Sequence, residues 1–281
     1  MQNRTKRQEL PQIIFRLRKW GYESPVFVGQ GAFSCVYRVR KPSTGLFYAC
    51  KISRQQEMLR QESELLQQIS HPLFPAFYDF RQEDGFVFLF MEWIPGESLE
   101  ELLAARGGMT KRQIVRIVGK LAEGLCYLHE RSTPILFRDL KPENIIIRED
   151  GEVKLLDMGS ACPVDAATQV VTGTCGYAAP EQWRELEKVG FHSDVYALGQ
   201  VMKHMMGNRK AETGYREIKE LVTECTRADI AERIPNMRVL LHRLKPCAEE
   251  NRRGIRYLKS KARLGGRKQN QYVFQKNILK F

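Results

Sequence analysis

The hydrophobic pattern of this chain is mainly that of strands before Pro95-Gly96 and mainly that of helices after it, and this change limits the folds open to the sequence. Before that point, apolar and polar residues alternate in "SPVFVGQGAFSCVYRVRK" and "PSTGLFYACKIS", which is typical of antiparallel strands joined by a turn. A helical segment over 54–70 and two more strands on either side of Glu83-Asp84-Gly85 complete this part. The first third of the chain is therefore predicted to be a small β-rich lobe with one main helix.

The chain becomes mostly helical after residue 96. Thr110-x-x-Gln113 is a capping box, which is a sequence signature of a helix start. Apolar residues then recur with the period of a helix that faces a core, at Ile114, Ile117, Val118, Leu121, Leu125 and Leu128. Short strands are expected around 145–147 and 153–156, and helices from about 181, 194, 217 and 236. The predicted fold class is α+β, with a Pro-Gly hinge between the β-rich lobe and a larger α-helical lobe.

Charge separates the two ends from the body of the chain. Residues 251–281 carry ten Lys or Arg and no acid, and residues 1–20 carry six against one acid. We therefore expect a basic N-terminal extension over 1–20, a first lobe over 21–94, a second lobe over 95–250 and a basic tail over 251–281. The tail is either a solvated end or a contact for an acidic partner, an anionic lipid or a nucleic acid.

The cysteines and the apolar runs indicate the compartment. Seven cysteines are scattered without a C-x-x-C pair or a zinc-like spacing, which suits a reducing environment. The N-terminus lacks the apolar core of a secretion signal, and the longest apolar run, over 86–94, is about half a membrane span. We predict a cytoplasmic protein without a transmembrane segment.

Two charged residues are predicted to face the core of the first lobe. The apolar stripe of the 54–70 helix holds Met58, Leu59, Leu65, Leu66 and Ile69. Glu62 falls within this stripe, because successive helical residues rotate by about 100°. On the strand "LFYACKIS", Lys51 shares a face with Phe47 and Ala49. Since an unpaired buried charge costs about 3 to 5 kcal/mol, we expect Lys51 and Glu62 to form an ion pair.

Glycines and oxygen donors indicate phosphate chemistry. "GQGAFS" leads into a strand, whereas the glycines of a dinucleotide fingerprint open a helix. Glycines at a hairpin bend instead let backbone N–H groups approach a phosphate closely. The segment "ILFRDLKPENIII" sets Asp139 and Asn144 between two apolar runs, and Asp157 follows another apolar strand. Carboxylate and amide oxygens suit Mg²⁺ that also binds phosphates, and Asp139 is then left to receive a proton from a hydroxyl. Each of these residues alone also fits a polar turn.

Together these residues resemble the protein kinase family over about 26–244. "GQGAFSCV" resembles the glycine-rich loop, "ACK" the strand that carries the lysine, and "FRDLKPEN" the catalytic loop. "DMG" stands where the family has Asp-Phe-Gly, and "GTCGYAAPE" resembles the end of the activation segment. The resemblance implies a bilobal protein-kinase-like fold, ATP as the phosphate donor, and Mg²⁺, with Mn²⁺ as an alternative, as the metal.

The resemblance also implies a role for each matching position. The implied catalytic residues are Asp139 as base, Lys141, Lys51 and Glu62, and the implied metal ligands are Asn144 and Asp157. The implied nucleotide-binding residues are Gly29, Gly31, Ser34, Val36, Ala49, Lys51, Met91, Glu92, Trp93, Ile94, Ser98 and Ile146. Two scaffold roles also follow from it, an ion pair between Glu181 and Arg233 and an anchor for the catalytic loop at Asp194.

The same comparison implies a serine/threonine kinase. Lys141 and Thr174 are typical of that branch, and "GTCGYAAPEQ" is most similar to its bacterial members. Ser34, Phe137 and Met158 depart from the family pattern, and the segment 207–217 is short where relatives carry a substrate-docking helix. The expected function is transfer of the γ-phosphate of Mg·ATP to a serine or threonine of a protein substrate. A pseudokinase that serves as a nucleotide-binding scaffold remains an alternative, as does a small-molecule phosphotransferase, although "GTCGYAAPE" argues against the latter.

Arg138, directly before the expected base, resembles the arginine of kinases whose activation loop docks a phosphate. Thr168 and Thr172 are the candidate phosphosites, because a phosphothreonine would offer this arginine a charge-assisted hydrogen bond. The alternative is an enzyme that is active without modification.

Overall fold

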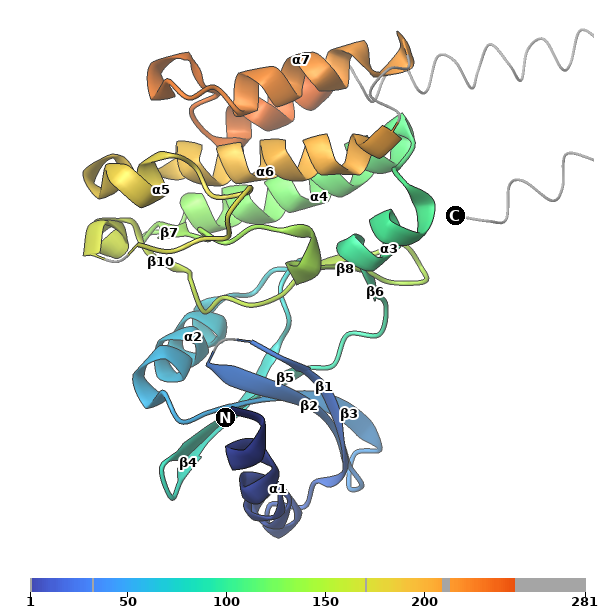
Figure 1. Ribbon diagram of the computed structural model, residues 1–281, viewed down its shortest axis with the longest axis vertical. Coiled ribbons are helices and arrows are strands. Elements are labelled where there is room, and N and C mark those ends of the chain that lie inside the picture. The colour runs from blue at the N-terminus through green and yellow to red at the C-terminus, as the bar shows by residue number, and fades with distance from the viewer. Residues whose placement is uncertain (1, 32, 170, 209–212, 246–281) are drawn as a thin grey trace, which may run out of the picture. The chain divides into compact units, whose positions relative to one another are not determined.

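The structure of the protein is a computed structural model that describes residues 2–31, 33–169, 171–208 and 213–245. The side chains of residues 2–9, 168, 169 and 213 are not described. The chain forms two compact units (Figure 1). The first unit is Met1–Pro95 with Lys154–Ser160, and the second unit is Gly96–Val153 with Ala161–Phe281. The predicted basic tail over 251–281 lies outside the described residues.

A five-stranded antiparallel sheet forms the body of the first unit. Its strands are β1 (Glu23–Gln30), β2 (Ser34–Lys41), β3 (Leu46–Ser53), β4 (Phe77–Glu83) and β5 (Phe86–Glu92). They lie in the order β1-β2-β3-β5-β4. Asp84 (φ 49°) and Gly85 (φ 78°) form the turn between β4 and β5. Two left-handed residues give such a turn a twist that matches the strands on either side of it. The strands predicted from alternating hydrophobicity are confirmed.

Helix α2 (Gln56–Gln68) packs against β4 and β5 of this sheet. Its buried residues are Leu59, Glu62, Ser63 and Leu66, so the prediction that Glu62 faces inward is confirmed. The prediction for Met58 is wrong, because its side chain is exposed. The buried stripe is centred one residue further along the helix, and Ser63 occupies its edge in place of Met58.

Helix α1 (Gln2–Lys19) precedes the sheet and was not predicted from the sequence. Ile13 and Leu17, in its C-terminal half, are buried in one cluster with residues of the sheet. Burial of each such side chain contributes about 1.5 to 3 kcal/mol. Part of the predicted basic extension over 1–20 therefore belongs to the core of the first unit.

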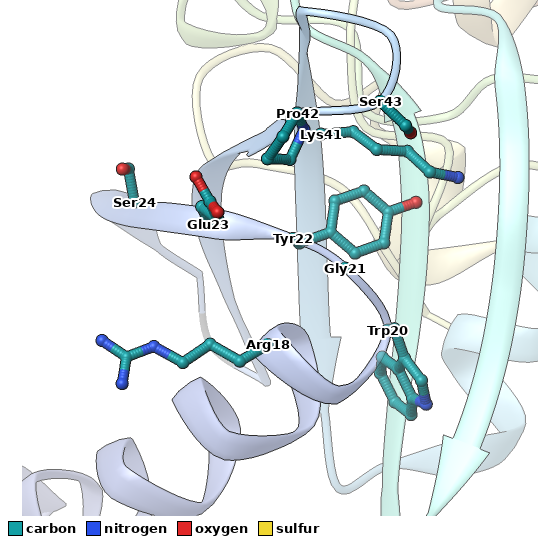
Figure 2. Close-up of a pocket in the computed structure, with 9 residues that line it drawn as sticks. All are labelled: Arg18, Trp20, Gly21, Tyr22, Glu23, Ser24, Lys41, Pro42 and Ser43. Atoms are coloured by element: carbon teal, nitrogen blue, oxygen red, sulfur yellow. The ribbon is translucent and has the colours of Figure 1, made fainter.

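The chain turns from α1 into β1 beside an open groove of about 700 Å³ (Figure 2). Gly21 (φ 78°) allows this turn, because a left-handed backbone is strained for most other residues. The Trp20 ring meets the Phe88 ring edge-on at 4.9 Å between centroids, and Tyr22 stacks on Phe90 at 4.4 Å. Burial raises the pKa of Tyr22 to about 12. These ring contacts hold the end of α1 on the sheet.

Helices form most of the second unit. They are α3 (Leu99–Arg106), α4 (Lys111–His129), α5 (Glu181–Arg184), α6 (Phe191–Met206), α7 (Arg216–Cys225) and a helical segment over 237–245. Helix α6 packs against both α4 and α7 (Figure 1). Thr110 and Gln113 form the predicted capping box at the start of α4. The six apolar positions predicted for the core face of α4 are all buried, so this prediction is confirmed.

Short strands and 3-10 turns connect these helices. The strands are β6 (Glu97–Ser98), β7 (Ile135–Leu136), β8 (Ile145–Ile147), β9 (Val153–Leu155) and β10 (Cys162–Pro163). The 3-10 turns are Pro142–Asn144, Val164–Gln169, Leu186–Lys188, Thr213–Tyr215 and Ile230–Glu232. β6 pairs with β8, and β7 pairs with β10. The charged loop 138–144 therefore has a paired strand at each end, which fixes its backbone on both sides.

Candidate active site

Lys51 on β3 is the centre of a charged group in the first unit. Its Nζ donates hydrogen bonds to both carboxylate oxygens of Glu62 on α2, at 2.7 and 2.9 Å. A third hydrogen bond, of 2.7 Å, joins Nζ to Oδ1 of Asp157, which follows β9. Lys51 and Glu62 are both buried, so the predicted ion pair is confirmed as a contact.

The two carboxylates keep the lysine charged. Burial alone would lower the pKa of Lys51, but the charges of Glu62 and Asp157 outweigh it and raise the pKa above its ordinary value. Burial raises the pKa of Glu62, and the nearby ammonium group of Lys51 counteracts that shift. The group therefore holds one cation between two carboxyl side chains.

Asp157 has an unusual backbone, with a φ of 63°. Positive φ is uncommon outside glycine, although aspartate tolerates it better than most residues. Gly159 N donates a hydrogen bond of 3.2 Å to Asp157 Oδ1. A side chain at residue 159 would meet Asp157 Oδ1 at 3.1 Å and Glu62 Oε2 at 3.5 Å. Glycine at this position leaves room for the charged group.

The other residues expected to bind a nucleotide through the first unit lie on or beside the same sheet. Gly29 on β1 pairs with Val36 on β2, which pairs with Lys51 on β3. Ala49 pairs with Met91 on β5, and both residues are buried. The glycine-rich bend closes with a hydrogen bond of 2.9 Å from the N–H of Gly31 to the carbonyl oxygen of Ser34, around residue 32, which lies outside the described residues.

The segment after β5 is held by charged side chains. Glu92 accepts a hydrogen bond of 2.8 Å from Lys154 Nζ and one of 3.3 Å from the backbone N–H of Ala76. The Arg38 guanidinium lies 5.6 Å from the centroid of the Trp93 ring. Ile94, the next residue, is buried. The segment 92–94, which is implied to bind the nucleotide, is therefore held by side chains of β2 and β9 and by the backbone before β4.

Asp139 is the centre of a second group, which belongs to the second unit. Thr174 Oγ1 donates a hydrogen bond of 2.6 Å to Asp139 Oδ1, and Lys141 Nζ donates one of 2.8 Å to Oδ2. Lys141 Nζ also donates to Thr174 Oγ1 at 2.8 Å. The three side chains form a closed triangle, so two donors fix the orientation of the carboxylate.

Asn144 lies in the same loop and is buried. Its Nδ2 donates a hydrogen bond of 3.1 Å to the backbone carbonyl of Asp139. Because the nitrogen is used as a donor, the amide oxygen is the atom left to bind a cation. An amide oxygen is a ligand of the type that Mg²⁺ accepts when phosphates supply the rest.

The backbone of the loop is anchored by Asp194 on α6. Its two carboxylate oxygens accept hydrogen bonds from the N–H groups of Phe137 (2.9 Å) and Arg138 (2.8 Å). Arg138 has a φ of 66°, a strained value that these bonds help to hold. His129 on α4 also contacts Asp194, with 2.9 Å between Nε2 and Oδ2. The predicted anchor at Asp194 is confirmed as a contact, whereas His129 was not predicted, because only the packing of α4 on α6 brings it there.

Glu181 and Arg233 form the other predicted scaffold contact. Two hydrogen bonds of 2.6 and 3.1 Å join the guanidinium to the carboxylate, and both residues are buried. Burial alone would raise the pKa of Glu181, but the hydrogen bonds from Arg233 lower it below its ordinary value. Ser193 Oγ adds a third donor at 2.8 Å. This pair links α5 to the segment before the last helix.

Two other predicted residues occupy different local settings. Ser98 is the N-cap of α3, where its hydroxyl accepts from Glu101 N at 3.2 Å and donates to Glu101 Oε2 at 2.8 Å. The sequence analysis missed this helix start. Ile146 lies on β8 opposite Ser98 and is partly buried.

The expected phosphosites lie in the segment before Thr174. The side chain of Thr168 lies outside the described residues. Arg138 Nη1 donates to the backbone carbonyl of Ala167 at 3.4 Å. The carbonyl of Thr172 accepts a hydrogen bond of 3.0 Å from Gln182 Nε2, which also donates to the carbonyl of Arg138 at 2.9 Å. Gln182 therefore joins the catalytic loop to this segment, a role that the sequence did not indicate.

Neither a membrane-spanning helix nor a cluster of metal-binding side chains is present among the described residues. Among the helices over the described ranges, none combines the length and the apolar character that a bilayer crossing needs. In the part of the chain that the structure describes, three or more His, Cys, Asp or Glu side chains do not gather where they would hold a metal.

Comparison with known proteins gives one family. The profile of the family described as "Protein kinase domain" matches residues 22–236. Serine/threonine-protein kinase plk-2 of Caenorhabditis elegans is 31% identical over 207 residues, which are 69% of this chain and 32% of that protein. Putative serine/threonine-protein kinase PRKY of Homo sapiens is 30% identical over 189 residues, 64% of this chain and 67% of that protein.

A bacterial relative is also among the similar proteins. Serine/threonine-protein kinase PknL of Mycobacterium tuberculosis is 35% identical over 159 residues, which are 55% of this chain and 39% of that protein. The chain spans only about a third to a half of the length of the first curated relatives that it matches.

Proposed function

Because the chain belongs to the protein kinase family, we propose that it transfers the γ-phosphate of ATP to a serine or threonine hydroxyl of a protein substrate. The single observation that carries this proposal is the Asp139 carboxylate, oriented by Lys141 and Thr174. An acceptor hydroxyl needs a fixed base within hydrogen-bond reach. The three relatives described above are named as serine/threonine-protein kinases, which supports the same acceptor class.

The residues act mainly by position and charge. Asp139 accepts the proton of the substrate hydroxyl, and Lys141 balances negative charge on the transferred phosphate. Lys51, held by Glu62, binds the α and β phosphates of ATP. Catalysis of phosphoryl transfer requires little covalent chemistry from the protein, so the placement of these groups supplies most of the rate.

The remaining binding roles follow the sheet and the loops that carry them. Ala49, Met91 and the segment 92–94 are proposed to hold the adenine, and Ser98 the ribose. The glycine-rich bend at Gly29 and Gly31, with Ser34 and Val36, covers the phosphates, and Ile146 lies under the base. For Ser98, ribose binding would compete with its hydrogen bonds to Glu101. We therefore expect the ribose contact to be the weakest of these roles.

Asn144 and Asp157 are the proposed ligands of a magnesium ion, with manganese as a substitute. When bound with ATP, such an ion neutralises phosphate charge and lowers the barrier to transfer. Asp157 is already oriented by Lys51 and by Gly159 N, and Asn144 by its bond to the loop backbone. A cation bound to Asp157 would lie near the positive charge of Lys51, and the negative charge of bound phosphates would offset the repulsion. We therefore expect the metal ion and the phosphates to bind together.

Location, lineage and activation are further parts of the proposal. The cysteines that the structure describes are free thiols, which supports a reducing compartment such as the cytoplasm. The identity to PknL supports a bacterial type of serine/threonine kinase.

Phosphorylation of Thr168 or Thr172 would add a charge that Arg138, a neighbour of this segment, is suited to bind. We also propose that residues 21–94 and 95–250 form the two lobes of the kinase domain.

Asp139→Asn and Asp157→Ala test the proposed function. Radiolabelled γ-phosphate is followed from ATP to a peptide library that contains serine, threonine or tyrosine as the acceptor. We expect label on serine or threonine peptides only, and a loss of about 100-fold to 10,000-fold in Asp139→Asn. ATP binding without transfer by the unchanged protein would favour the pseudokinase alternative. Undiminished transfer by Asp139→Asn would show that this aspartate is not the base.

A further inference from the structure

The turn between β4 and β5 is held on one side by helix α1. Arg16 Nη2 donates a hydrogen bond of 2.5 Å to Asp84 Oδ2, and Lys19 Nζ donates one of 2.8 Å to Glu83 Oε1. The Arg16 side chain is only 7% exposed, because its guanidinium also lies over the ring of Phe86, 5.3 Å from the centroid. Two ion pairs and a ring contact therefore fix the tip of this hairpin to α1.

The same hairpin is held on another side by helix α2. Gln82 Nε2 donates a hydrogen bond of 2.7 Å to Gln56 Oε1, and Arg60 Nη2 donates one of 3.1 Å to Gln82 Oε1. Arg54, just before α2, lies 4.1 Å from the centroid of the Phe86 ring. Gln82 thus connects two successive turns of α2 to the hairpin residues that α1 holds.

Helix α2 also carries Glu62, two residues after Arg60. From these contacts we infer that α1 is a positioning element for the Lys51–Glu62 pair and acts through the β4–β5 hairpin. Arg16 and Asp84 are its main positioning residues. Figure 1 shows the hairpin beside both helices. The family match covers residues 22–236, so α1 lies outside the matched domain.

The geometry of the pair explains why the position of α2 matters. The hydrogen bonds between Lys51 and Glu62 measure 2.7 and 2.9 Å, and hydrogen bonds weaken steeply outside their preferred distances and angles. A shift of α2 by about 1 Å would break at least one of them, and misplacement of that size is costly in catalysis. The inference rests on the roles proposed above for Lys51 and Glu62.

Asp84→Asn tests the inference in the full-length chain. Asparagine tolerates the positive φ of residue 84, so the turn is kept while the charge that Arg16 binds is removed. We expect kcat for peptide phosphorylation to fall about threefold to tenfold, because the Asp84 side chain is largely exposed and an exposed ion pair is weaker than a buried one. KM for the peptide should stay unchanged, because the hairpin is not a proposed substrate contact. Gln82→Ala removes the two hydrogen bonds that join Gln82 to Gln56 and Arg60 on α2, and it should also lower kcat without changing KM.

The discriminating measurement repeats Asp84→Asn in a Glu62→Gln background. If α1 acts through Glu62, the Lys51–Glu62 pair is already impaired in Glu62→Gln. Adding Asp84→Asn to this variant should therefore lower kcat further by less than about twofold. A merely stabilising role predicts the same fall in both backgrounds, and that result would overturn the inference. An unchanged kcat in Asp84→Asn and Gln82→Ala would overturn it as well.

Controls separate this inference from the proposed function. Glu224→Gln breaks an exposed ion pair with Arg243 on the second unit and should leave kcat unchanged. Full activity of Glu62→Gln would disprove the role proposed for Glu62 and so remove the basis of the inference. A large loss in Glu62→Gln with none in Asp84→Asn would disprove the role of α1 alone. If Asp84→Asn does not fold, Gln82→Ala provides the same comparison.

Discussion

Thr174 donates its hydroxyl hydrogen to Asp139 over 2.6 Å, although the two residues lie 35 positions apart in the chain. The same hydroxyl oxygen accepts a hydrogen bond of 2.8 Å from Lys141 Nζ. The threonine therefore connects the activation segment to the loop that carries the proposed base. When the segment that holds Thr174 moves, the carboxylate loses one of its two donors.

We expect Thr174→Val to lower kcat by about 10-fold to 100-fold. Valine keeps the shape of threonine but removes the hydroxyl, and a hydrogen bond to a charged group is worth about 1.5 to 3 kcal/mol. Thr174→Ser keeps the hydroxyl and should retain most of the activity. Initial rates of phosphate transfer to the peptide library measure the difference. Equal rates for the valine and serine variants would show that the hydroxyl has no part in orienting Asp139.

The buried ion pair between Glu181 and Arg233 predicts a large change in stability. Arg233→Met should lower the free energy of unfolding by about 3 to 5 kcal/mol, because Glu181 is left buried without its cation. Urea unfolding followed by circular dichroism measures this quantity.

A double variant distinguishes a lost charge partner from lost packing. Glu181→Met with Arg233→Met removes both charges and should recover a large part of the loss, since apolar residues often replace a buried pair well. Glu185→Gln, which disrupts the exposed pair with Lys188 nearby, should change the free energy of unfolding by less than about 1 kcal/mol. A double variant no more stable than Arg233→Met would mean that packing, not the orphaned charge, sets the cost.

His192 on α6 predicts a pH dependence of stability. Burial lowers the pKa of His192, while nearby Glu181 and the carbonyl oxygen of Lys188, 2.8 Å from Nε2, counteract the shift. Between the lowered pKa and the ordinary value near 6.5, the unfolded chain binds more protons than the folded one. The contribution of this histidine to stability is therefore present above about pH 6.5 and is lost as the pH falls.

The comparison with His192→Gln isolates this contribution from the other histidines. The free energy of unfolding should rise with pH between about pH 5 and 7 more steeply in the unchanged protein than in the variant. Urea unfolding at several pH values in this range measures both slopes. Parallel slopes would mean that His192 has the same pKa in the folded and unfolded chains.

The Lys51–Glu62 pair could be predicted from the sequence, because the pattern around each residue within its own strand or helix shows that it faces the core. A glutamate within an apolar helical stripe and a lysine on an apolar strand face both need a partner of opposite charge when they are buried. The contact of Asp139 with Thr174 could not be derived in that way. Its two residues come from separate loops, and only the packed fold brings them together. His129 at Asp194 was missed for the same reason.

Helix α1 could not be predicted, because its sequence lacks a clear helical pattern of apolar residues. Pro11 lies inside the helix, and Phe15, an apolar residue between Ile13 and Leu17, is exposed. Among the described side chains of α1, the apolar residues buried against the sheet are Ile13 and Leu17, which is too short a pattern to stand out from a basic extension. Helix α3 was missed because its first signal, Ser98, was interpreted as a ribose contact rather than as an N-cap.

Gly207, directly after α6, predicts a localised steric effect. Its φ is 48°, and a Cβ at this residue would lie 2.0 Å from the carbonyl oxygen of Gly107, which accepts a hydrogen bond of 3.1 Å from Asn208 N. Gly207→Ala must displace one of these backbones, so we expect the free energy of unfolding to fall by about 2 to 4 kcal/mol. In Gly214→Ala, in the same unit, no atom of the described residues lies within 4 Å of the added Cβ, and stability should change by less than about 0.5 kcal/mol. Urea unfolding of both variants measures the contrast, and equal stabilities would disprove the close approach of residues 107 and 207.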